Sequence, residues 1–281
     1  MNSRLLPYLL LAPATLFLCV FFAYPFVLVV VEAFTRDGQV TMANFQEMVG
    51  NWKFPTTLGN TMLLAGTVVP LQLVMALSMA SVVSHLERGR SAVLYIFAIP
   101  LGISDLAAGI MWLAIFEQSG FLNSILTTTG IVDQPVQFLG YQNKMMIFVA
   151  VLLAELWRAT AIVMVILVAG MGLIPKEYNE AAEVFGATRW QRFIKVTLPL
   201  LRPSLQTALI LRTILAFEVF AVVVALSGTN FPVLMGETYH WQFDLQDRNV
   251  AAAFAMLILV ISISFTLFFI KALNVPKEAR I

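Results

Sequence analysis

The chain has 281 residues, of which 60% are hydrophobic and only 12% are charged, and its mean hydropathy is +0.87. Because a soluble domain carries about 25% charged residues, a chain this apolar needs lipid as the solvent for much of its surface. The formal net charge of +1 gives no electrostatic basis for binding nucleic acid. With one cysteine (Cys19) and two histidines (His85 and His240), the sequence offers neither an intramolecular disulfide nor a cluster of metal ligands.

Six apolar runs are long enough to cross a bilayer, whose hydrocarbon core requires about 20 helical residues. They cover residues 5–31, 57–83, 92–116, 145–173, 205–227 and 249–273. The first run has 27 residues without a charge, which is too long for the apolar region of a signal peptide, so we expect it to be retained as a span. The runs are continuously apolar, which favours helices over the alternating strands of a barrel. The sequence therefore predicts an all-α polytopic membrane protein with six transmembrane helices.

The distribution of basic residues predicts the orientation of these spans. An even number of spans places both termini on the same side of the membrane. The termini and loops 84–91 and 174–204 hold 11 of the 17 Lys and Arg residues, whereas loops 34–56, 117–144 and 228–248 hold 4. By the positive-inside rule, we expect the N-terminus, the C-terminus and the first group of loops to be cytoplasmic.

The cytoplasmic loop 174–204 differs from the other loops in its pattern. Pro175 ends the fourth span, because proline cannot continue a helix and disfavours helical geometry in the residue before it. The residues that follow are typical of a short helix that ends at Gly186. Thr188 and Gln191 have the spacing of a capping box and predict the start of a second short helix. The loop is therefore predicted to be a helix, a glycine corner and a second helix.

Two prolines bound the second half of this loop. We expect the second short helix to end before Pro199, and we expect Pro203 to lie in the first turn of the fifth span. The short helices mix aromatic and charged side chains, which is a composition suited to docking against another protein.

The sequence Glu180-Ala181-Ala182, followed by Gly186 and then by Val196-Thr197-Leu198-Pro199, resembles the EAA signature of permease subunits of binding-protein-dependent ABC importers. The family usually has Ile at the position of Val196. The surrounding segment GATRWQRFIKVTLPLLRPSL resembles the carbohydrate branch, which includes maltose and glycerol-phosphate permeases. The resemblance runs from residue 60 to the end of the chain and includes Asn60-Thr61, the stretch Pro100–Trp112, Gly120 and Asn123. The Gly-Gly-Pro that often follows the fifth span is present here only as Gly228-Thr229-Asn230-Phe231-Pro232.

The resemblance implies that loop 174–204 is a coupling element that sits in a cleft of a cytoplasmic ATPase subunit. Small side chains at Ala181 and Ala182 permit close approach, and Glu180 would make a charge-assisted contact with a basic partner residue. Gly186 supplies a corner that is expected to need positive φ. The family motif assigns Val196, Leu198 and Pro199 to the same coupling element. The alternative interpretation is a solvated amphipathic loop in which the signature occurs by chance.

The resemblance also implies the rest of the assembly. The motif GxxxxGK[ST] is absent from the sequence, so the chain is not expected to be an enzyme or to bind a cofactor, and ATP and Mg²⁺ would bind to two copies of a partner ATPase subunit. Six helices suit half of a pore, which a second, homologous permease subunit or a second copy of this chain would complete. The chain would receive a sugar or related polyol from an extracytoplasmic solute-binding protein, in a bacterial or archaeal plasma membrane, and would work by alternating access.

Charged residues within the predicted spans are candidates for the translocation path, because each costs about 2.5 to 3.5 kcal/mol at a helix centre and should face protein or water. Glu155 and Arg158 are neighbours on one helix and can form a pair, and Asp105 could cap a broken helix. The candidate path residues are Glu155, Arg158, Glu218, Asp105, Trp112 and Trp157, with a tryptophan stacking on a sugar ring. The alternative is that Glu155 and Arg158 form a structural pair, that Arg212 extends toward the cytoplasmic face, and that the tryptophans pack in the bundle.

Other classes of membrane protein remain as alternatives. A permease of the same type could carry a non-carbohydrate solute. An ion-coupled secondary transporter would also be polytopic, but we see no internal repeat and it would need no docking loop. An intramembrane hydrolase is disfavoured because His85 and His240 both lie in loops. A purely structural membrane protein is disfavoured only by the loop signature.

Overall fold

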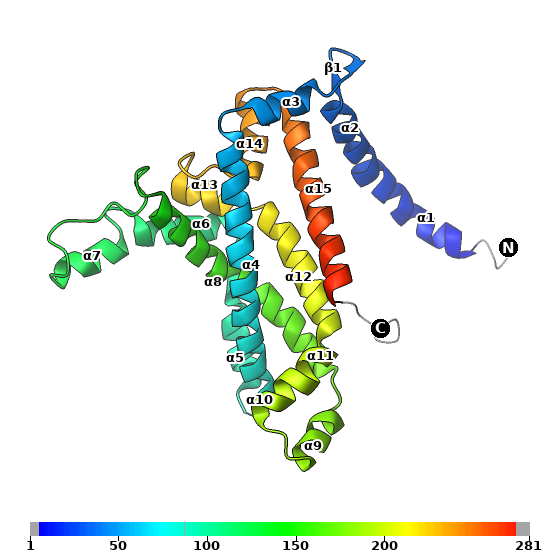
Figure 1. Ribbon diagram of the computed structural model, residues 1–281, viewed down its shortest axis with the longest axis vertical. Helices are drawn as coiled ribbons and strands as arrows, with labels where there is room; N and C mark the ends of the chain where they lie inside the picture. The colour runs from blue at the N-terminus through cyan, green and yellow to red at the C-terminus, as the bar shows by residue number, and fades with distance from the viewer. Residues whose placement is uncertain (1–5, 87, 274–281) are drawn as a thin grey trace. The chain divides into compact units, whose positions relative to one another are not determined.

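The computed structural model describes residues 6–86 and 88–273. Leu5, where the first predicted span begins, lies outside these residues, as do Arg4, Lys277 and Arg280, which contribute to the asymmetry of basic charge. The described residues fold almost entirely into helices, which Figure 1 labels in order. The elements are α1 (Leu6–Leu18), η1 (Cys19–Ala23), α2 (Tyr24–Ala33), β1 (Thr35–Arg36), β2 (Gln39–Val40), α3 (Ala43–Gly50), α4 (Phe54–His85), α5 (Arg90–Ala98), η2 (Ile99–Gly102), α6 (Asp105–Phe116), α7 (Phe121–Thr128), α8 (Lys144–Gly172), α9 (Lys176–Val184), α10 (Arg189–Arg192), η3 (Phe193–Thr197), α11 (Leu198–Leu200), α12 (Arg202–Phe217), α13 (Ala221–Ser227), α14 (Leu234–Tyr239), η4 (His240–Asp244) and α15 (Arg248–Leu273).

The chain divides into two compact units. The smaller unit comprises residues 1–55 and 234–260, and the larger unit comprises residues 56–233 and 261–281. The boundaries fall inside α4 and α15, so each of these helices contributes to both units.

Among the described residues, four helical segments are each long and apolar enough to cross a membrane: Tyr8–Ala33, Phe54–His85, Lys144–Gly172 and Arg248–Leu273. Two further helix pairs meet the same criterion only if each bent pair is counted as one span. The structure thus contains four to six candidate spans, and the sixfold crossing stays a prediction. The fold class is confirmed, since the described chain is nearly all α-helical.

The third predicted span, residues 92–116, is not one straight helix. Its first half, Arg90–Gly102, and the segment that begins at Asp105 differ in direction by 96°. Ser104 is the N-cap of α6, because its hydroxyl accepts a hydrogen bond from the amide of Ala107 at 3.2 Å. Asp105 therefore lies in the first turn of α6, where its carboxylate also complements the helix dipole, and the residue before it performs the capping.

The fifth predicted span, residues 205–227, is also interrupted. The helix α12 ends at Phe217, and α13 begins at Ala221, so residues 218–220 are non-helical. This break is not predicted from the sequence, because residues 217–220 include neither proline nor glycine.

The expectation that the second short loop helix ends before Pro199 is wrong. The helix continues through η3 and α11 to Leu200. The amide of Leu198 bonds to the carbonyl of Phe193, five residues back, and the amide of Leu201 returns to the usual spacing by bonding to Thr197. Pro199 lies at this change of hydrogen-bond register, where its missing N–H leaves no donor unpaired. Pro203 occupies the first turn of α12, as predicted.

Two hydrophobic clusters form the core of the larger unit. One contains Leu64, Val68, Ile147, Phe148, Val151, Ala154, Val219, Val222, Val223, Leu226, Phe231 and Val233, and the other contains Ala76, Ala80, Val83, Val163, Met164, Leu167, Val168, Leu201, Leu205 and Ala208. Both clusters are built from α4, α8 and the helices around the fifth predicted span. The close approach of α8 to α12 depends on Gly170, since a Cβ there would lie 2.6 Å from the Cβ of Ser204.

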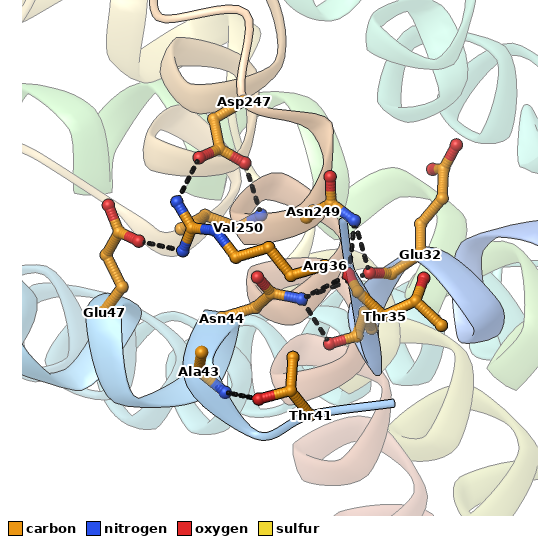
Figure 2. A network of polar contacts seen from close by, with 11 residues as sticks. Glu32, Thr35, Arg36, Thr41, Ala43, Asn44, Glu47, Asp247, Asn249 and Val250 are labelled. Atoms are coloured by element: carbon orange, nitrogen blue, oxygen red, sulfur yellow. Dashed lines mark hydrogen bonds and ion pairs between the residues drawn. The ribbon is translucent and has the colours of Figure 1, made fainter. Parts of the chain in front are cut away.

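In the smaller unit, Arg36 at the end of a short β-hairpin binds two carboxylates. Figure 2 shows its guanidinium between Glu47 of α3 and Asp247, which directly precedes α15. The Arg36–Asp247 pair spans 3.5 Å, and Asp247 also accepts a hydrogen bond from the amide of Val250 at 3.1 Å. The hydrogen bond to Glu47 raises the pKa of Arg36 further above its ordinary value.

Two asparagines complete this polar network. Asn44 of α3 donates to the carbonyls of Ala33 and Thr35, each at 3.0 Å, and Asn249 of α15 donates to the carbonyls of Glu32 at 3.0 Å and Thr35 at 2.6 Å (Figure 2). The carbonyls of Glu32 and Ala33 lie at the end of α2, where a helix leaves its last acceptors unpaired, and that of Thr35 lies just beyond it in β1. The network thus fixes the end of the first predicted span to the start of the last one.

Candidate functional site

The loop between α8 and α12 has the local structure that the sequence predicts. The helix α9 ends at Val184, and Gly186 has φ +74°, which a side chain would strain. Thr188 and Gln191 form a reciprocal capping box at the start of α10. An ion pair of 2.7 Å between Glu183 and Arg192 joins the two helices across the corner.

This loop exposes its signature residues and its large apolar side chains. Glu180, Ala181 and Gly186 are exposed, and Ala182 is half-buried. The most exposed apolar side chains of the loop are those of Val184 and Phe185, whose exposed fractions are 86% and 89%. These two neighbouring apolar side chains lie at the end of α9 and are left uncovered by the described residues.

The remaining residues of the signature lie at the base of the loop. Val196, Leu198 and Pro199 are half-buried, and Leu198 packs against the cluster that contains Leu201 and Leu205. The structure therefore separates the signature into an exposed part on α9 and a part that attaches the loop to the core of the larger unit.

A second set of functional candidates forms a chain of polar contacts inside the larger unit. Glu155 of α8 is fully buried, and its Oε2 lies 2.7 Å from an Nη atom of Arg212 on α12, which is 1% exposed. Arg212 also donates from Nε to the side-chain oxygen of Gln72 on α4. Gln72 in turn donates to the backbone carbonyl of Glu155 at 2.7 Å. Three helices are thus joined by one buried ion pair and one buried amide.

Arg158 extends this chain toward the break in the third predicted span. One of its Nη atoms lies 2.8 Å from Oδ1 of Asp105 at the start of α6, and the other lies 3.5 Å from Oε1 of Glu155. The Arg158 side chain is 18% exposed, and that of Asp105 is 50% exposed. The polar chain therefore runs from a buried end at Gln72 to a half-exposed end at Asp105.

Two members of this chain were not identified as site residues from the sequence. One expectation from the sequence is that Arg212 extends toward the cytoplasmic face. Arg212 instead lies ten residues into α12, about 15 Å along the helix, and is buried against Glu155. Gln72 was not singled out at all. A charged residue in an apolar run predicts that a counter-charge or a polar partner lies nearby, because an unpaired charge is costly in the membrane. The sequence does not indicate which helix supplies that partner.

The tryptophans and Glu218 complete the set of candidates. The rings of Trp112 and Trp157 meet edge to face with centroids 6.3 Å apart, and Trp112 stacks on Phe116 at 5.7 Å. Glu218 is exposed at the end of α12, where the fifth predicted span is interrupted. In the described part of the chain, none of the ion pairs includes Glu218.

Comparison with protein families identifies the chain. Residues 72–280 match the family described as "Binding-protein-dependent transport system inner membrane component". The chain belongs to this family. It is therefore a multi-pass membrane component of a transport system, as the resemblance in loop 174–204 predicted.

Named relatives of this membrane component are permeases. It is 33% identical to the trehalose/maltose transport system permease protein MalF of Thermococcus litoralis, over 72% of this chain and 69% of the relative. It is 27% identical to the sn-glycerol-3-phosphate transport system permease protein UgpA of Agrobacterium fabrum, over 95% of this chain and 94% of the relative. Its fold matches that of a chain of a bacterial ABC transporter involved in alginate import, with a TM-score of 0.82, 22% identity, and 96% and 95% of the two chains covered.

Proposed function

We propose that this chain is one of the two pore-forming subunits of an ATP-driven importer for a sugar or a related polyol. The family places it in a binding-protein-dependent transport system, and its relatives include permeases named for trehalose, maltose and glycerol phosphate. The single observation that carries the coupling mechanism is the exposed helix–corner–helix of α9 and α10 with its uncovered apolar side chains.

In this proposal, α9 docks in a cleft of a cytoplasmic ATPase subunit, and two copies of that subunit bind and hydrolyse ATP with Mg²⁺. The loop is cytoplasmic, as are both termini. Ala181 and Ala182 let the ATPase approach the helix, and Glu180 pairs with a basic residue of the ATPase. The ion pair between Glu183 and Arg192 keeps the two short helices at a fixed angle, so that a movement of the ATPase is transmitted to α12.

The solute path follows from the exposed charges within the predicted spans. A carboxylate at bilayer depth cannot face lipid without a large cost, yet Asp105 and Glu218 are both exposed in the isolated chain. We therefore assign the surfaces that carry these two carboxylates to a water-filled path shared with a second permease subunit. Carboxylates accept hydrogen bonds from sugar hydroxyls. Trp112 and Trp157 are the candidates for stacking on the apolar side of a sugar, with whatever ring surface their contacts with each other and with Phe116 leave uncovered. An extracytoplasmic binding protein delivers the solute to this path.

In this conformation, the buried residues of the polar chain hold the helices beside the proposed path and do not contact the solute. Glu155 is fully buried and paired with Arg212, so it offers no free face to a solute here. Arg158 links this buried pair to Asp105 and is the candidate that can reach both the path and the core.

The coupling proposal is tested with Gly186→Val in the reconstituted importer. The substitution places a β-branched side chain at φ +74°, and we expect loss of solute-stimulated ATP hydrolysis or of ATPase-subunit retention on purification. Ala182→Trp and Glu180→Lys should have the same effect, because they obstruct or reverse the docking contact. A matched control is Gly130→Val, since Gly130 has φ +70° and open space around it but lies in loop 117–144.

The control separates coupling from backbone strain. Both glycine substitutions strain a left-handed residue to a similar degree, but only the one at Gly186 lies in the proposed docking surface. If all three loop variants hydrolyse ATP and transport solute as the parent does, the loop is not a coupling element and the proposal fails.

A further inference from the structure

The polar chain that ends at Asp105 has one end buried among three helices and one end on a helix that follows a sharp bend. Glu155, Arg212 and Gln72 are buried and hold α4, α8 and α12 together. Asp105 instead belongs to α6, which is joined to the preceding helix by the non-helical residues 103–104 at a bend of 96°. Arg158 lies between these two ends.

The helix that carries Asp105 is itself paired with a second interrupted helix. α6 packs closely on α13, because Gly109 has no side chain: a Cβ there would lie 2.6 Å from the Cβ of Ala225. α13 follows the second break, at residues 218–220. The two helices, shown side by side in Figure 1, thus form a pair in which each member follows a short non-helical link and also packs on α8. A change in the angle of this pair would unwind neither helix, but it would have to shift the packing of Val222, Val223 and Leu226 against α8.

Glu155 has a vacant acceptor that faces Arg158. Its Oε2 is bound by Arg212 at 2.7 Å, but its buried Oε1 accepts no hydrogen bond and lies 3.5 Å from the nearer Nη of Arg158. A buried acceptor without a donor is unfavourable, and a small movement of the guanidinium would satisfy it. Arg158 therefore binds Asp105 closely through one Nη atom at 2.8 Å and lies 3.5 Å from Glu155 through the other, so a small shift would change which carboxylate it binds more closely.

We propose that Arg158 is a two-position switch that binds Asp105 when α6 is in the orientation seen here and moves to Oε1 of Glu155 when the pair α6–α13 changes its angle. In the second position Arg158 and Arg212 share the carboxylate of Glu155, so Arg158 keeps a carboxylate contact, and the half-exposed Asp105 loses its partner. Arg212 and Gln72 are positioning residues, because they hold the receiving carboxylate in place. The inference deepens the proposed transport function and rests on it only for the step that drives the movement.

The direct test is an experimental structure of the isosteric variant Asp105→Asn, determined beside the control variant Glu117→Gln. Glu117 is an exposed carboxylate at the other end of α6, so the control removes the same charge from the same helix. The switch predicts that Arg158 contracts onto Oε1 of Glu155, to about 2.7 to 3.0 Å, in the first variant only. If Oε1 still lacks a donor in Asp105→Asn, or if both variants show the same change, the switch is refuted. This measurement does not depend on transport.

The functional counterpart is measured in the assembled importer, in a background with Cys19→Ser. Gly102 is exposed at the bend and has open space for a side chain, so Gly102→Cys reports on this segment through its rate of reaction with a thiol reagent. Loss of a half-exposed ion pair should shift the equilibrium between the two positions of Arg158 by about 1.4- to 5-fold. Asp105→Asn should therefore change the labelling rate of the cysteine at position 102 toward the rate measured in the state trapped with ATP and vanadate.

The outcomes of the two measurements are distinguishable. If the parent importer lacks solute-stimulated ATP hydrolysis, the proposed function fails while the structural test of Arg158 still stands. If the parent is active but its labelling rate is the same in both states and unaffected by Asp105→Asn, α6 does not move and the switch is refuted.

Discussion

Removing Arg212 should be more harmful than removing the ion pair to which it belongs. Arg212→Met leaves the carboxylate of Glu155 buried with only the 3.5 Å contact to Arg158, and breaking a buried pair in this way costs about 3 to 5 kcal/mol. At roughly 2 to 4 °C per kcal/mol for a chain of this size, the midpoint of thermal inactivation should fall by about 6 to 20 °C. Replacing both members, with Glu155→Leu and Arg212→Met, should recover most of this loss.

The structure also predicts that the double variant does not recover all of the lost stability. Without Arg212, the buried side-chain oxygen of Gln72 loses its donor, which costs about 1 to 3 kcal/mol. Adding Gln72→Met removes that acceptor and should improve the double variant further, although it also removes the donor to the carbonyl of Glu155. By contrast, the pair Glu155→Leu with Arg158→Met leaves Arg212 buried without a counter-ion and should be no better than Arg212→Met alone.

The assay follows the fraction of purified protein that elutes as a monodisperse peak after heating, so that each variant yields a midpoint temperature. Transport by the reconstituted importer is measured in parallel. The reasoning is refuted if Glu155→Leu with Arg212→Met is no more stable than Arg212→Met alone, because the cost would then not arise from an unpaired charge. If that double variant is stable and correctly assembled yet transport-dead, the pair has a role in the path beyond holding three helices together.

Two further predictions concern orientation and packing. In a Cys19-free background, cysteine at Asp133 should react with an impermeant thiol reagent added outside intact cells, whereas cysteine at Gln191 should not; the reverse pattern would contradict the predicted orientation. Gly170→Ala should destabilise the chain by about 1 to 3 kcal/mol, because the new Cβ overlaps Ser204, and the second change Ser204→Gly should restore part of the midpoint temperature; equal stability of the Gly170 variant and the parent would show that α8 and α12 separate freely.

Elements with local causes could be predicted from the sequence. The apolar runs marked the candidate spans, because the length of a run and its lack of charge are properties of consecutive residues. The corner at Gly186 and the capping box of Thr188 and Gln191 were also predicted, because a cap and a left-handed turn each depend on residues only a few positions apart. The family followed from the same short segment, and the match over residues 72–280 confirms it.

The tertiary structure alone decided the features that depend on which helices meet. Glu155 and Arg158 could be paired from their spacing, but the stronger partner of Glu155 is Arg212, 57 residues away, and Gln72 joins them from 83 residues away. The break at residues 218–220 contains no proline or glycine, so no local signal in the sequence predicts it. A charged residue in an apolar run predicts from the sequence alone that a counter-charge is present. Only the folded bundle determines which residue lies within hydrogen-bond distance of it.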